Sequence, residues 1–427
     1  MIMSMIRPET EMKDSGIEWI GDIPESWTIR PLKSLYTLTT GFTPNSKDDS
    51  LYDENGETWV TIGDLKGDII YNSKQKISKK VADMHRAEMT KQGSLMYSFK
   101  LSVGTVAVAG KDLFTNEAIA SFLPKNRHGN LHYLKYASSL IIGNANTNIY
   151  GAFIMNQQLI LNAPLPLPSL DEQQAIADYL DETCSKIDEI IAEAKASIDE
   201  YKELKQSVIF EAVTKGLDKN VEMKQCSVNW LDEIPSTWES IRLKYLLTEI
   251  NNRSETGTEQ PLSVSQVMGV VPSYMIAVAN PTASYVRQKI VEPNDIVFNK
   301  LKAHLGVFFM SKYHGLVSPD YAVYRTNDKV IPKYLEYLFH TSACISEFKK
   351  YISGVAEGLM RLYTSDLFNI RICLPKVDEQ IKIVEYVENK VELFDSLIAE
   401  KESLINDLES YKKSLIYEVV TGKRRVV

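Results

Sequence analysis

The chain has 427 residues and a mass of 48.4 kDa, which corresponds to two or three domains at about 150 residues each. Hydrophobic residues make up 44% and charged residues 24%; this balance excludes a largely disordered chain and an integral membrane protein. The net charge of −8 argues at first against a nucleic-acid partner. Four widely separated cysteines without a CxxC pair indicate neither a disulfide framework nor a zinc site. The N-terminal segment lacks an apolar signal core, so we expect a cytoplasmic protein.

The first predicted element in chain order is a short tryptophan motif, WIGDIPESW, at residues 19–27. A body of about 130 residues follows, which is a common size for one domain. Runs rich in β-branched and aromatic residues predict strands at 58–62 and 105–108, and the stretch 133–140 predicts a helix. We therefore expect a compact α/β body that ends in a proline-rich segment.

A long helix is predicted next, over residues 171–215. This segment contains no proline or glycine, and Gly216 stands where a glycine commonly ends a helix. Apolar residues recur in alternate steps of four and three from Leu180 to Tyr201, which indicates a heptad seam. At 1.5 Å per residue, the helix would be about 67 Å long.

The same order of elements is then repeated. A second tryptophan motif, WLDEIPSTW, precedes a body with predicted strands at 295–298 and 306–309 and a predicted helix at 332–340. A second long helix, 378–422, has the same seam with one interruption at Lys401. We expect the two long helices to pack antiparallel and bury both apolar stripes. The alternative is that each helix packs only on its own body.

The two long helical segments are similar in sequence. Residues 171–215 align with 378–422 at a constant offset of 207, and 16 of the 45 positions are identical. The bodies match poorly, apart from short echoes such as Tyr133 with Tyr334 and Lys100 with Lys300. A repeated frame with divergent inserts indicates one scaffold that presents two recognition surfaces. An old duplication whose halves have drifted apart is the alternative.

The negative charge is concentrated in the helices. Residues 171–215 hold 5 Lys/Arg against 12 Asp/Glu, and residues 378–422 hold 5 against 11. In the bodies the balance is reversed, with 15 against 11 in residues 28–150 and 14 against 12 in residues 239–370. Local charge decides whether a surface can approach phosphates, so the bodies remain candidates for DNA binding.

The cations of the two bodies are the candidate DNA-binding residues, because Lys and Arg neutralise phosphates and Arg also reads base edges. We expect a loop at a strand end to carry Lys300 and Lys302, with Lys312 in the same cluster. For each cation the alternative is an ordinary solvated surface charge. The full set of candidates is Lys74, Lys76, Lys79, Lys80, Arg86 and Lys100 in the first body and Arg287, Lys300, Lys302, His304 and Arg361 in the second.

No familiar catalytic motif occurs in the sequence. It contains no GxxxxGK[ST] phosphate loop, no GxGxxG, no Asn/Asp-Pro-Pro-aromatic methyltransferase motif, no HExxH and no GxSxG. A binding protein is therefore expected, with no catalytic or metal-binding residues. A coiled-coil scaffold whose bodies bind proteins is the alternative to a DNA-binding protein, and a nuclease with an unrecognised site is a third hypothesis.

Both long helices begin at a junction of the same pattern, LPSLDEQ at residues 167–173 and LPKVDEQ at 374–380. Further short pieces are NEAIA at 116–120, PLSVSQ followed by GVVP within 261–272, and the glycine-containing stretch 353–361. In this order, and with the repeated tryptophan motifs, the chain resembles the DNA-specificity subunits of type I restriction-modification systems over essentially its full length.

The resemblance implies an α/β fold in which two globular α/β target recognition domains are separated by two long antiparallel coiled-coil helices, with an internal pseudo-two-fold duplication. The segments would be a first recognition domain at 1–165, a first spacer helix at 166–216, a second recognition domain at 217–370 and a second spacer helix at 371–427. Each domain would read one half of a bipartite DNA target, and the helices would set the gap between the halves.

The resemblance also implies partners. Two methyltransferase subunits would carry S-adenosylmethionine chemistry on adenine N6, and translocase-nuclease subunits would use ATP and Mg²⁺. This chain would bind double-stranded DNA, would hold no cofactor of its own, would catalyse nothing and would not associate with a membrane. The residues expected to dock the methyltransferase subunits or to build the spacer are Glu172, Gln173, Ile191, Glu193, Glu379, Gln380, Ile398 and Glu400.

Overall fold

The computed structural model describes residues 6–100, 102–147, 153–228, 230–276, 284–352 and 361–426. Most of the 353–361 motif noted in the sequence lies outside these residues. The chain forms two compact units, residues 1–194 with 404–427 and residues 195–403. Each long helix, α4 (Leu170–Lys215) and α8 (Val377–Val420), therefore contributes its two halves to different units.

The first unit is built on a five-stranded sheet with the order β4-β11-β8-β9-β6. A three-stranded sheet, β10-β5-β7, packs with helix α1, and β3 pairs with β14 just before α4. The elements that precede α4 are β1 (Met12–Asp14), β2 (Asp22–Pro24), β3 (Thr28–Pro31), β4 (Tyr36–Thr40), β5 (Tyr52–Val60), β6 (Ile69–Ile70), β7 (Gln75–Ile77), α1 (Lys79–Met84), β8 (Leu95–Ser98), β9 (Val106–Ala109), β10 (Phe114–Thr115), β11 (Ile119–Pro124), α2 (Leu131–Ala137), β12 (Asn146–Thr147), β13 (Phe153–Ile154), α3 (Gln157–Asn162) and β14 (Pro164–Leu167).

The second unit is built on a four-stranded antiparallel sheet with the order β18-β25-β22-β23. Two antiparallel strand pairs, the hairpin β19–β20 and the pair β21–β24, accompany it, and β17 pairs with β26 just before α8. The elements between α4 and α8 are β15 (Met223–Gln225), β16 (Glu233–Pro235), β17 (Glu239–Arg242), β18 (Leu247–Ile250), β19 (Leu262–Ser265), β20 (Gly269–Pro272), β21 (Lys289–Val291), β22 (Ile296–Phe298), β23 (Phe308–Met310), β24 (Gly315–Val317), β25 (Ala322–Thr326), α5 (Pro332–Phe339), α6 (Ser342–Lys350), α7 (Thr364–Asn369) and β26 (Arg371–Leu374).

Alternation along the strands gives the second sheet two buried faces. In β22, Ile296 and Phe298 join a large core with helices α5 and α6, whereas Val297 points to the other side, where it packs with residues of β19, β20, β21 and β24. Successive side chains of a strand point to opposite faces, so one short strand serves both layers. Helices therefore cover one face of this sheet, and the strand pairs β19–β20 and β21–β24 cover the other.

The two sheets share one topology. Strands β4, β11, β8 and β9 occur in the same order and with the same antiparallel pairing as β18, β25, β22 and β23. The additions differ, because the first unit adds β10-β5-β7 with α1 and the second adds β19–β20 and β21–β24. The predicted duplication is confirmed in the frame, and the inserts are where the bodies diverge.

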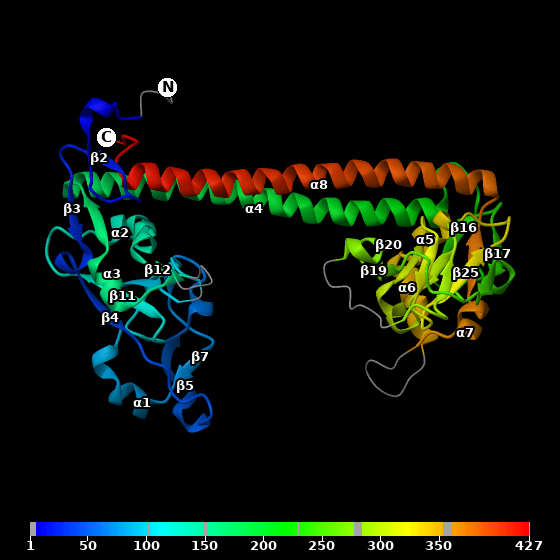
Figure 1. Ribbon diagram of the computed structural model, residues 1–427, viewed down its shortest axis with the longest axis horizontal. Coiled ribbons are helices and arrows are strands. Elements are labelled where there is room, and N and C mark those ends of the chain that lie inside the picture. Colours follow the sequence, from blue (N-terminus) through cyan, green and yellow to red (C-terminus); the bar gives the residue numbers. More distant parts are fainter. Residues whose placement is uncertain are drawn as a thin grey trace. The chain divides into compact units, whose positions relative to one another are not determined.

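The long helices pack antiparallel in each unit (Figure 1). In the first unit, Lys412 of α8 bonds Asp188 of α4 at 2.6 Å; in the second, Lys205 of α4 bonds Asp395 of α8 at 2.5 Å. The 207-residue offset maps each of these ion pairs onto the other. The seam is buried, with Leu180 fully covered and Ile198 7% exposed. The predicted antiparallel pair is thus confirmed, and the alternative of two independent helices is wrong.

The predicted strands and helices of the bodies are present with ends shifted by at most three residues, except that β5 begins six residues before the strand predicted at 58–62. One detail differs, because the segment after β22 that was expected to be a loop forms 3-10 turns over Lys300–Leu305, with a kink at Lys302 where the backbone leaves the helical conformation. Asn299 caps it by accepting a hydrogen bond from the Leu301 amide at 3.1 Å. The helix ends also differ, since α4 continues to Lys215 whereas α8 ends at Val420, two residues earlier in the aligned repeat.

Candidate nucleic-acid interface and helix junctions

Two sequence motifs that are far apart in the chain meet at the start of each long helix. The second tryptophan of each tryptophan motif is fully buried and donates its indole N–H to the glutamate of the Asp-Glu-Gln motif. The Trp27 Nε1–Glu172 Oε2 distance is 2.9 Å, and the Trp238 Nε1–Glu379 Oε1 distance is 3.2 Å. In the first unit, Arg7 adds a second bond to Glu172 at 2.9 Å. The two motifs thus form one junction.

The neighbouring glutamines are buried inside these junctions. Gln173 is 1% exposed and donates to the carbonyls of His128 and Pro168, and Gln380 is fully buried and donates to those of Lys329 and Pro375. The oxygen of Gln380 also accepts the Ile331 amide at 2.8 Å. The two glutamines were predicted to dock a partner subunit or to build the spacer helices, and their amides are buried in the structure. Each glutamine instead anchors its helix to its own domain.

Each junction also receives the end of the other long helix. Gly216 after α4 and Gly422 after α8 have φ values of +77° and +75°, which favour glycine. A Cβ at Gly422 would lie 2.4 Å from Pro24 and 3.1 Å from Trp27. A Cβ at Gly216 would lie 3.5 Å from Trp238. The tryptophan motif therefore contacts the start of one helix and the end of the other.

A buried tyrosine completes each junction. The hydroxyl of Tyr133 in α2 shares its one proton between the carbonyls of Pro166 at 2.8 Å and Val420 at 3.2 Å. The hydroxyl of Tyr334 in α5 donates to the carbonyl of Val213 at 2.7 Å. The last carbonyls of a helix have no partner within the helix. Each domain thus supplies a donor to the helix that ends in it. Burial is the main reason that the pKa of both tyrosines lies well above its ordinary range.

Replacing Tyr334 by phenylalanine should lower the free energy of unfolding by about 1–2 kcal/mol, because the Val213 carbonyl would remain buried without this donor. At about 2–4 °C per kcal/mol for a unit of this size, thermal denaturation would detect the change. Tyr245→Phe is the control, since that side chain is 59% exposed. An equal melting temperature for both variants would show that the hydrogen bond from Tyr334 does not stabilise the junction.

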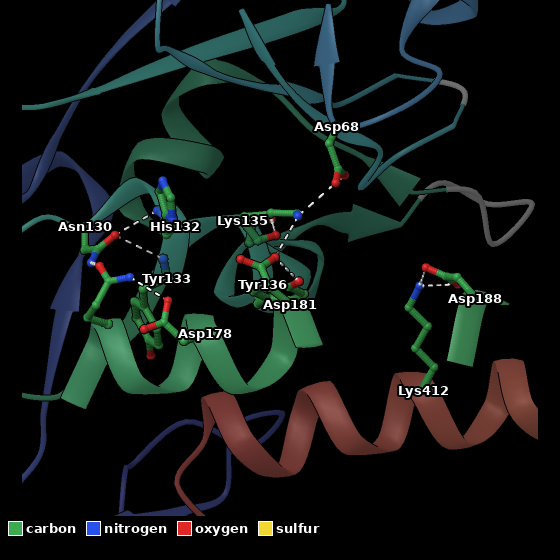
Figure 2. A network of polar contacts seen from close by, with 12 residues as sticks. Asp68, Asn130, His132, Tyr133, Lys135, Tyr136, Asp178, Asp181, Asp188 and Lys412 are labelled. Atoms are coloured by element: carbon green, nitrogen blue, oxygen red, sulfur yellow. Dashed lines mark hydrogen bonds and ion pairs between the residues drawn. The ribbon is translucent and has the colours of Figure 1, made fainter. Parts of the chain in front are cut away.

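Polar contacts also join α2 to α4 within the first unit (Figure 2). Lys135 lies between Asp181 at 3.0 Å and Asp68 at 3.5 Å, and the Tyr136 hydroxyl donates to Asp181 at 2.5 Å. Burial disfavours the charge of Asp181, but the hydrogen bonds from Tyr136 and Lys135 outweigh it and lower the pKa of Asp181. Together with the junction, this network orients the first domain on its half of the helical pair.

Most candidate cations of the first domain belong to one segment, β7 with α1 and the turn after it. Lys74, Lys79, Lys80 and Arg86 are exposed, and Lys76 is half-buried. Helix α1 is held in place by Val81 and Ala82, which pack with Trp59 and Phe114. The structure thus presents these cations from a supported element. Lys74 and Lys76 also line an open depression of about 560 Å³ that contains Asp49, Asp53 and Glu54, so this surface is not uniformly basic.

Lys100 lies apart from that segment, at the end of the central sheet. It follows β8 and lies 3.9 Å from Glu117, whose pKa is lowered mainly by a hydrogen bond from the Thr43 hydroxyl. Lys300 follows β22, the topological equivalent of β8, and lies 3.7 Å from Glu249. The sequence echo between the two lysines therefore corresponds to one structural position, at the same end of both sheets.

The candidates of the second domain gather around this position. Lys302 and His304 are exposed on the same 3-10 helix as Lys300, and the amide next to Arg361, that of Leu362, donates to the Lys300 carbonyl at 3.2 Å. Arg287 is exposed at a φ of +66°, and its carbonyl accepts a bond from the Arg253 side chain at 3.1 Å. The structure thus brings most of these cations to one end of the sheet.

Lys312 does not belong to this group, although the sequence placed it there. In the β22–β23 hairpin, Phe298 pairs with Phe308 at the end that carries Lys300, whereas Ile296 pairs with Met310 at the other end. Lys312 follows Met310 and therefore lies at the opposite end of the hairpin. Proximity in sequence failed here because an antiparallel hairpin carries the chain away from its starting point.

Sequence reasoning missed the buried cation of this region. Lys289, in β21, is 4% exposed; its ammonium donates to the Tyr321 carbonyl at 2.8 Å and lies 3.9 Å from Glu249. Burial is the largest cause of its lowered pKa, the nearby Lys300 adds to it and Glu249 opposes it. Glu249 thus holds Lys289 and Lys300 side by side. A lysine in a strand pattern carries no signal that would distinguish it from a surface cation.

One known protein family matches both halves of the chain. The family model "Type I restriction modification DNA specificity domain" matches twice, over residues 24–200 and 235–409. The chain belongs to this family of DNA specificity proteins. Each match covers one body and most of the helix after it, so the two matches follow the internal repeat.

Relatives of similar length support the assignment. The type I restriction enzyme EcoKI specificity subunit of Escherichia coli K12 is 22% identical over 94% of this chain and 90% of its own. The MjaVIII specificity subunit of Methanocaldococcus jannaschii is 24% identical over 74% of this chain and 76% of its own. A solved chain described with the assembly and conformational transition of the type I R-M system has the same fold, with a TM-score of 0.70 at 15% identity over 94% of this chain and 99% of that one.

The remaining helix candidates of this specificity protein lie near the middle of α4 and α8. Ile191 is 8% exposed and Ile398 is half-buried, so both belong to the seam between the helices. Glu193 and Glu400 are exposed, so they are the members of the predicted docking set that another subunit can reach. Within the described residues no helix is long and apolar enough to cross a membrane. The same residues contain no cluster of His, Cys, Asp and Glu suited to a metal ion.

Proposed function

We propose that this chain is the sequence-specific DNA-binding subunit of a type I restriction-modification complex. The observation that carries the proposal is the double match of the family model, because each match covers one cation-bearing body on a shared sheet frame. Each body would read one half of a bipartite target, and the divergence of the inserts would allow the two halves to differ in sequence.

The chemistry of the candidate surfaces agrees with this role. Lys100, Lys300 and Lys302 lie at the same end of equivalent sheets, where they would neutralise phosphates and set the orientation of each domain on the duplex. Side chains that reach the base edges would then add about 1–3 kcal/mol of discrimination for each base pair. The acidic helices would stay away from the phosphates and would separate the two domains.

The partners would bring the catalysis. We propose that two methyltransferase subunits dock along the helical regions, where Glu193 and Glu400 are exposed, and act on adenine with S-adenosylmethionine. Translocase-nuclease subunits would supply ATP- and Mg²⁺-dependent movement and cleavage. The specificity chain would hold no cofactor and would catalyse no step, since its contribution is the choice of the site.

Sequencing that detects adenine methylation in the host genome tests the proposal, with and without this chain. A split motif of two short defined parts and a constant gap should be methylated in the wild type and unmethylated in the deletion strain. Expression of the chain from a plasmid should restore the same motif. Identical methylation in both strains would contradict the proposed function.

Inserting four residues after Ala194 tests the role of the helices as a spacer. Four residues add about 6 Å of helix, which corresponds to about two base pairs at 3.4 Å per pair. An insertion of four residues is a stutter that a coiled coil absorbs by local unwinding. We expect the methylated motif to keep both halves and to gain one or two base pairs in its gap. A changed base in either half would contradict the spacer role.

A further inference from the structure

The hairpin β19–β20 of the second domain ends in an unusually exposed tip. Its three tip residues are Gln266, Val267 and Met268; all three are exposed, Val267 at 92% and Met268 at 52%. Tyr274 and Met275, just after β20, are 74% and 47% exposed. Several large apolar side chains in contact with solvent on one element mark an interaction surface rather than an accident of packing.

The tip is held in place from both sides. The Ser265 hydroxyl accepts the amides of Val267 and Met268, each at 3.2 Å. Gly269 closes the turn at a φ of +72°, and a Cβ there would lie 3.2 Å from the Phe309 ring. Leu262 and Val270, one on each strand, are buried in the sheet core. The exposed side chains therefore belong to a hairpin whose strands are packed in the core and whose turn is fixed by hydrogen bonds.

Contacts connect the tip to the basic end of the domain. Phe309, which Gly269 approaches, packs on the ring of His340 at 4.8 Å. His340 in turn lies beside Gly306, which ends the 3-10 helix that carries Lys302 and His304. These packing contacts link the base of the hairpin to the segment that carries the cations.

The charge of this segment selects the kind of partner. No aspartate or glutamate occurs from Gln260 to Val291, a stretch that holds the whole hairpin and the cations Arg287 and Lys289. An element that enters a groove of DNA passes between two phosphate backbones, where a carboxylate would be repelled. An apolar surface that docks on protein has no need to exclude acidic residues.

We propose that Gln266, Val267 and Met268 read base edges in the major groove of the half-site bound by the second domain. A two-stranded ribbon fits the major groove, a glutamine amide pairs with adenine N6 and N7, and small apolar groups contact the thymine methyl. The tip would therefore favour A·T pairs at adjacent positions. This inference rests on the proposed function and assigns the reading of bases to named residues.

The test is the methylated motif made by a full-length variant that combines Gln266→Ala, Val267→Ala and Met268→Ala, expressed in the deletion strain. We expect discrimination to fall about tenfold at one or two adjacent positions of one half of the motif, the size of one lost base contact. The other half and the gap should stay unchanged. Tyr245→Ala is the matched control, because this 59% exposed side chain precedes β18, at the end of the sheet away from Lys300.

The outcomes separate this inference from the proposed function. A split motif in the wild type that the triple variant reproduces unchanged would overturn the inference alone. Absence of any split motif in the wild type would overturn both. Loss of methyltransferase subunits from the purified variant complex would make the tip a protein-docking element and would also overturn the inference. Equal loss of affinity for correct and altered half-sites would assign the tip to the DNA backbone, and the inference would again be overturned.

The melting temperature of the variant complex serves as the control for unfolding. If the triple variant melts several degrees below the wild type, Val267→Thr replaces it, because this change keeps the shape of the side chain and alters only its polarity. If the motif methylated by that variant accepts additional bases at one position, the inference is supported. An unchanged motif would overturn it.

Discussion

Replacing Lys300 and Lys302 together by alanine should weaken DNA binding by the assembled complex at least tenfold in moderate salt. Each neutralised phosphate contributes about 0.9 to the slope of log affinity against log salt, so the slope should fall by up to about two. Lys302 is exposed, whereas Lys300 shares Glu249 with the buried Lys289. We therefore expect Lys302 to account for the larger part of the loss.

Lys312→Ala is the control for this experiment. The residue is an exposed lysine of the same hairpin, but it lies at the opposite end from Lys300. Binding titrations at several salt concentrations should give the wild-type affinity and slope for this variant. Equal slopes for the double variant and the control would exclude Lys300 and Lys302 from the DNA contact and would direct attention to Arg287 and Arg361.

Removing the glutamate side chain at the start of α4 should lower stability far more than the equivalent change in α8. Glu172→Ala leaves the Trp27 indole without its partner and leaves Arg7 with the more distant Glu11 at 3.8 Å. Both side chains of the broken ion pair are little exposed, at 13% for Arg7 and 17% for Glu172. Breaking such a buried pair costs about 3–5 kcal/mol. Glu379→Ala removes one hydrogen bond from Trp238, which is worth about 1–2 kcal/mol.

Thermal or urea denaturation of the two variants measures this difference, with each glutamate as the matched control for the other. Glu172→Gln should recover part of the loss, because an amide oxygen still accepts the Trp27 indole. If Glu172→Ala and Glu379→Ala lower the free energy of unfolding equally, Arg7 contributes nothing to the junction. The aligned repeat predicts such equality, since the Asp-Glu-Gln motif is identical in both copies.

The long helices were predictable because their signals are local. The alternate spacing of Leu180, Cys184 and Ile187 places the side chains on one face of any helix, and a glycine after the last turn ends it. Polar interruption by Lys401 did not prevent pairing, since the residues around it still supply the seam. The strands of the bodies were likewise visible as β-branched runs, such as the one that became β22.

The candidate surface was less predictable, because the positions of charged residues along the sequence do not show where the chain reverses direction. Lys300 and Lys312 are twelve positions apart and were grouped together, yet the hairpin places them at opposite ends. Lys289 was overlooked, although it lies beside Lys300. Gln173 and Gln380 were assigned to subunit docking or to the spacer helices, and only the packing of the domains on them shows that they are buried.

By itself, the sequence determined the duplication, the α/β character of the bodies, the two long helices and the family to which the chain belongs. These depend on spacing and order, which are properties of the chain in one dimension. Only the tertiary structure decided that each tryptophan motif binds the glutamate of one helix and the glycine end of the other, and that a tyrosine of each domain caps a helix arriving from the opposite half. The hydrogen bonds among these contacts join residues more than a hundred positions apart. No local pattern specifies them, because each depends on how the whole domain packs.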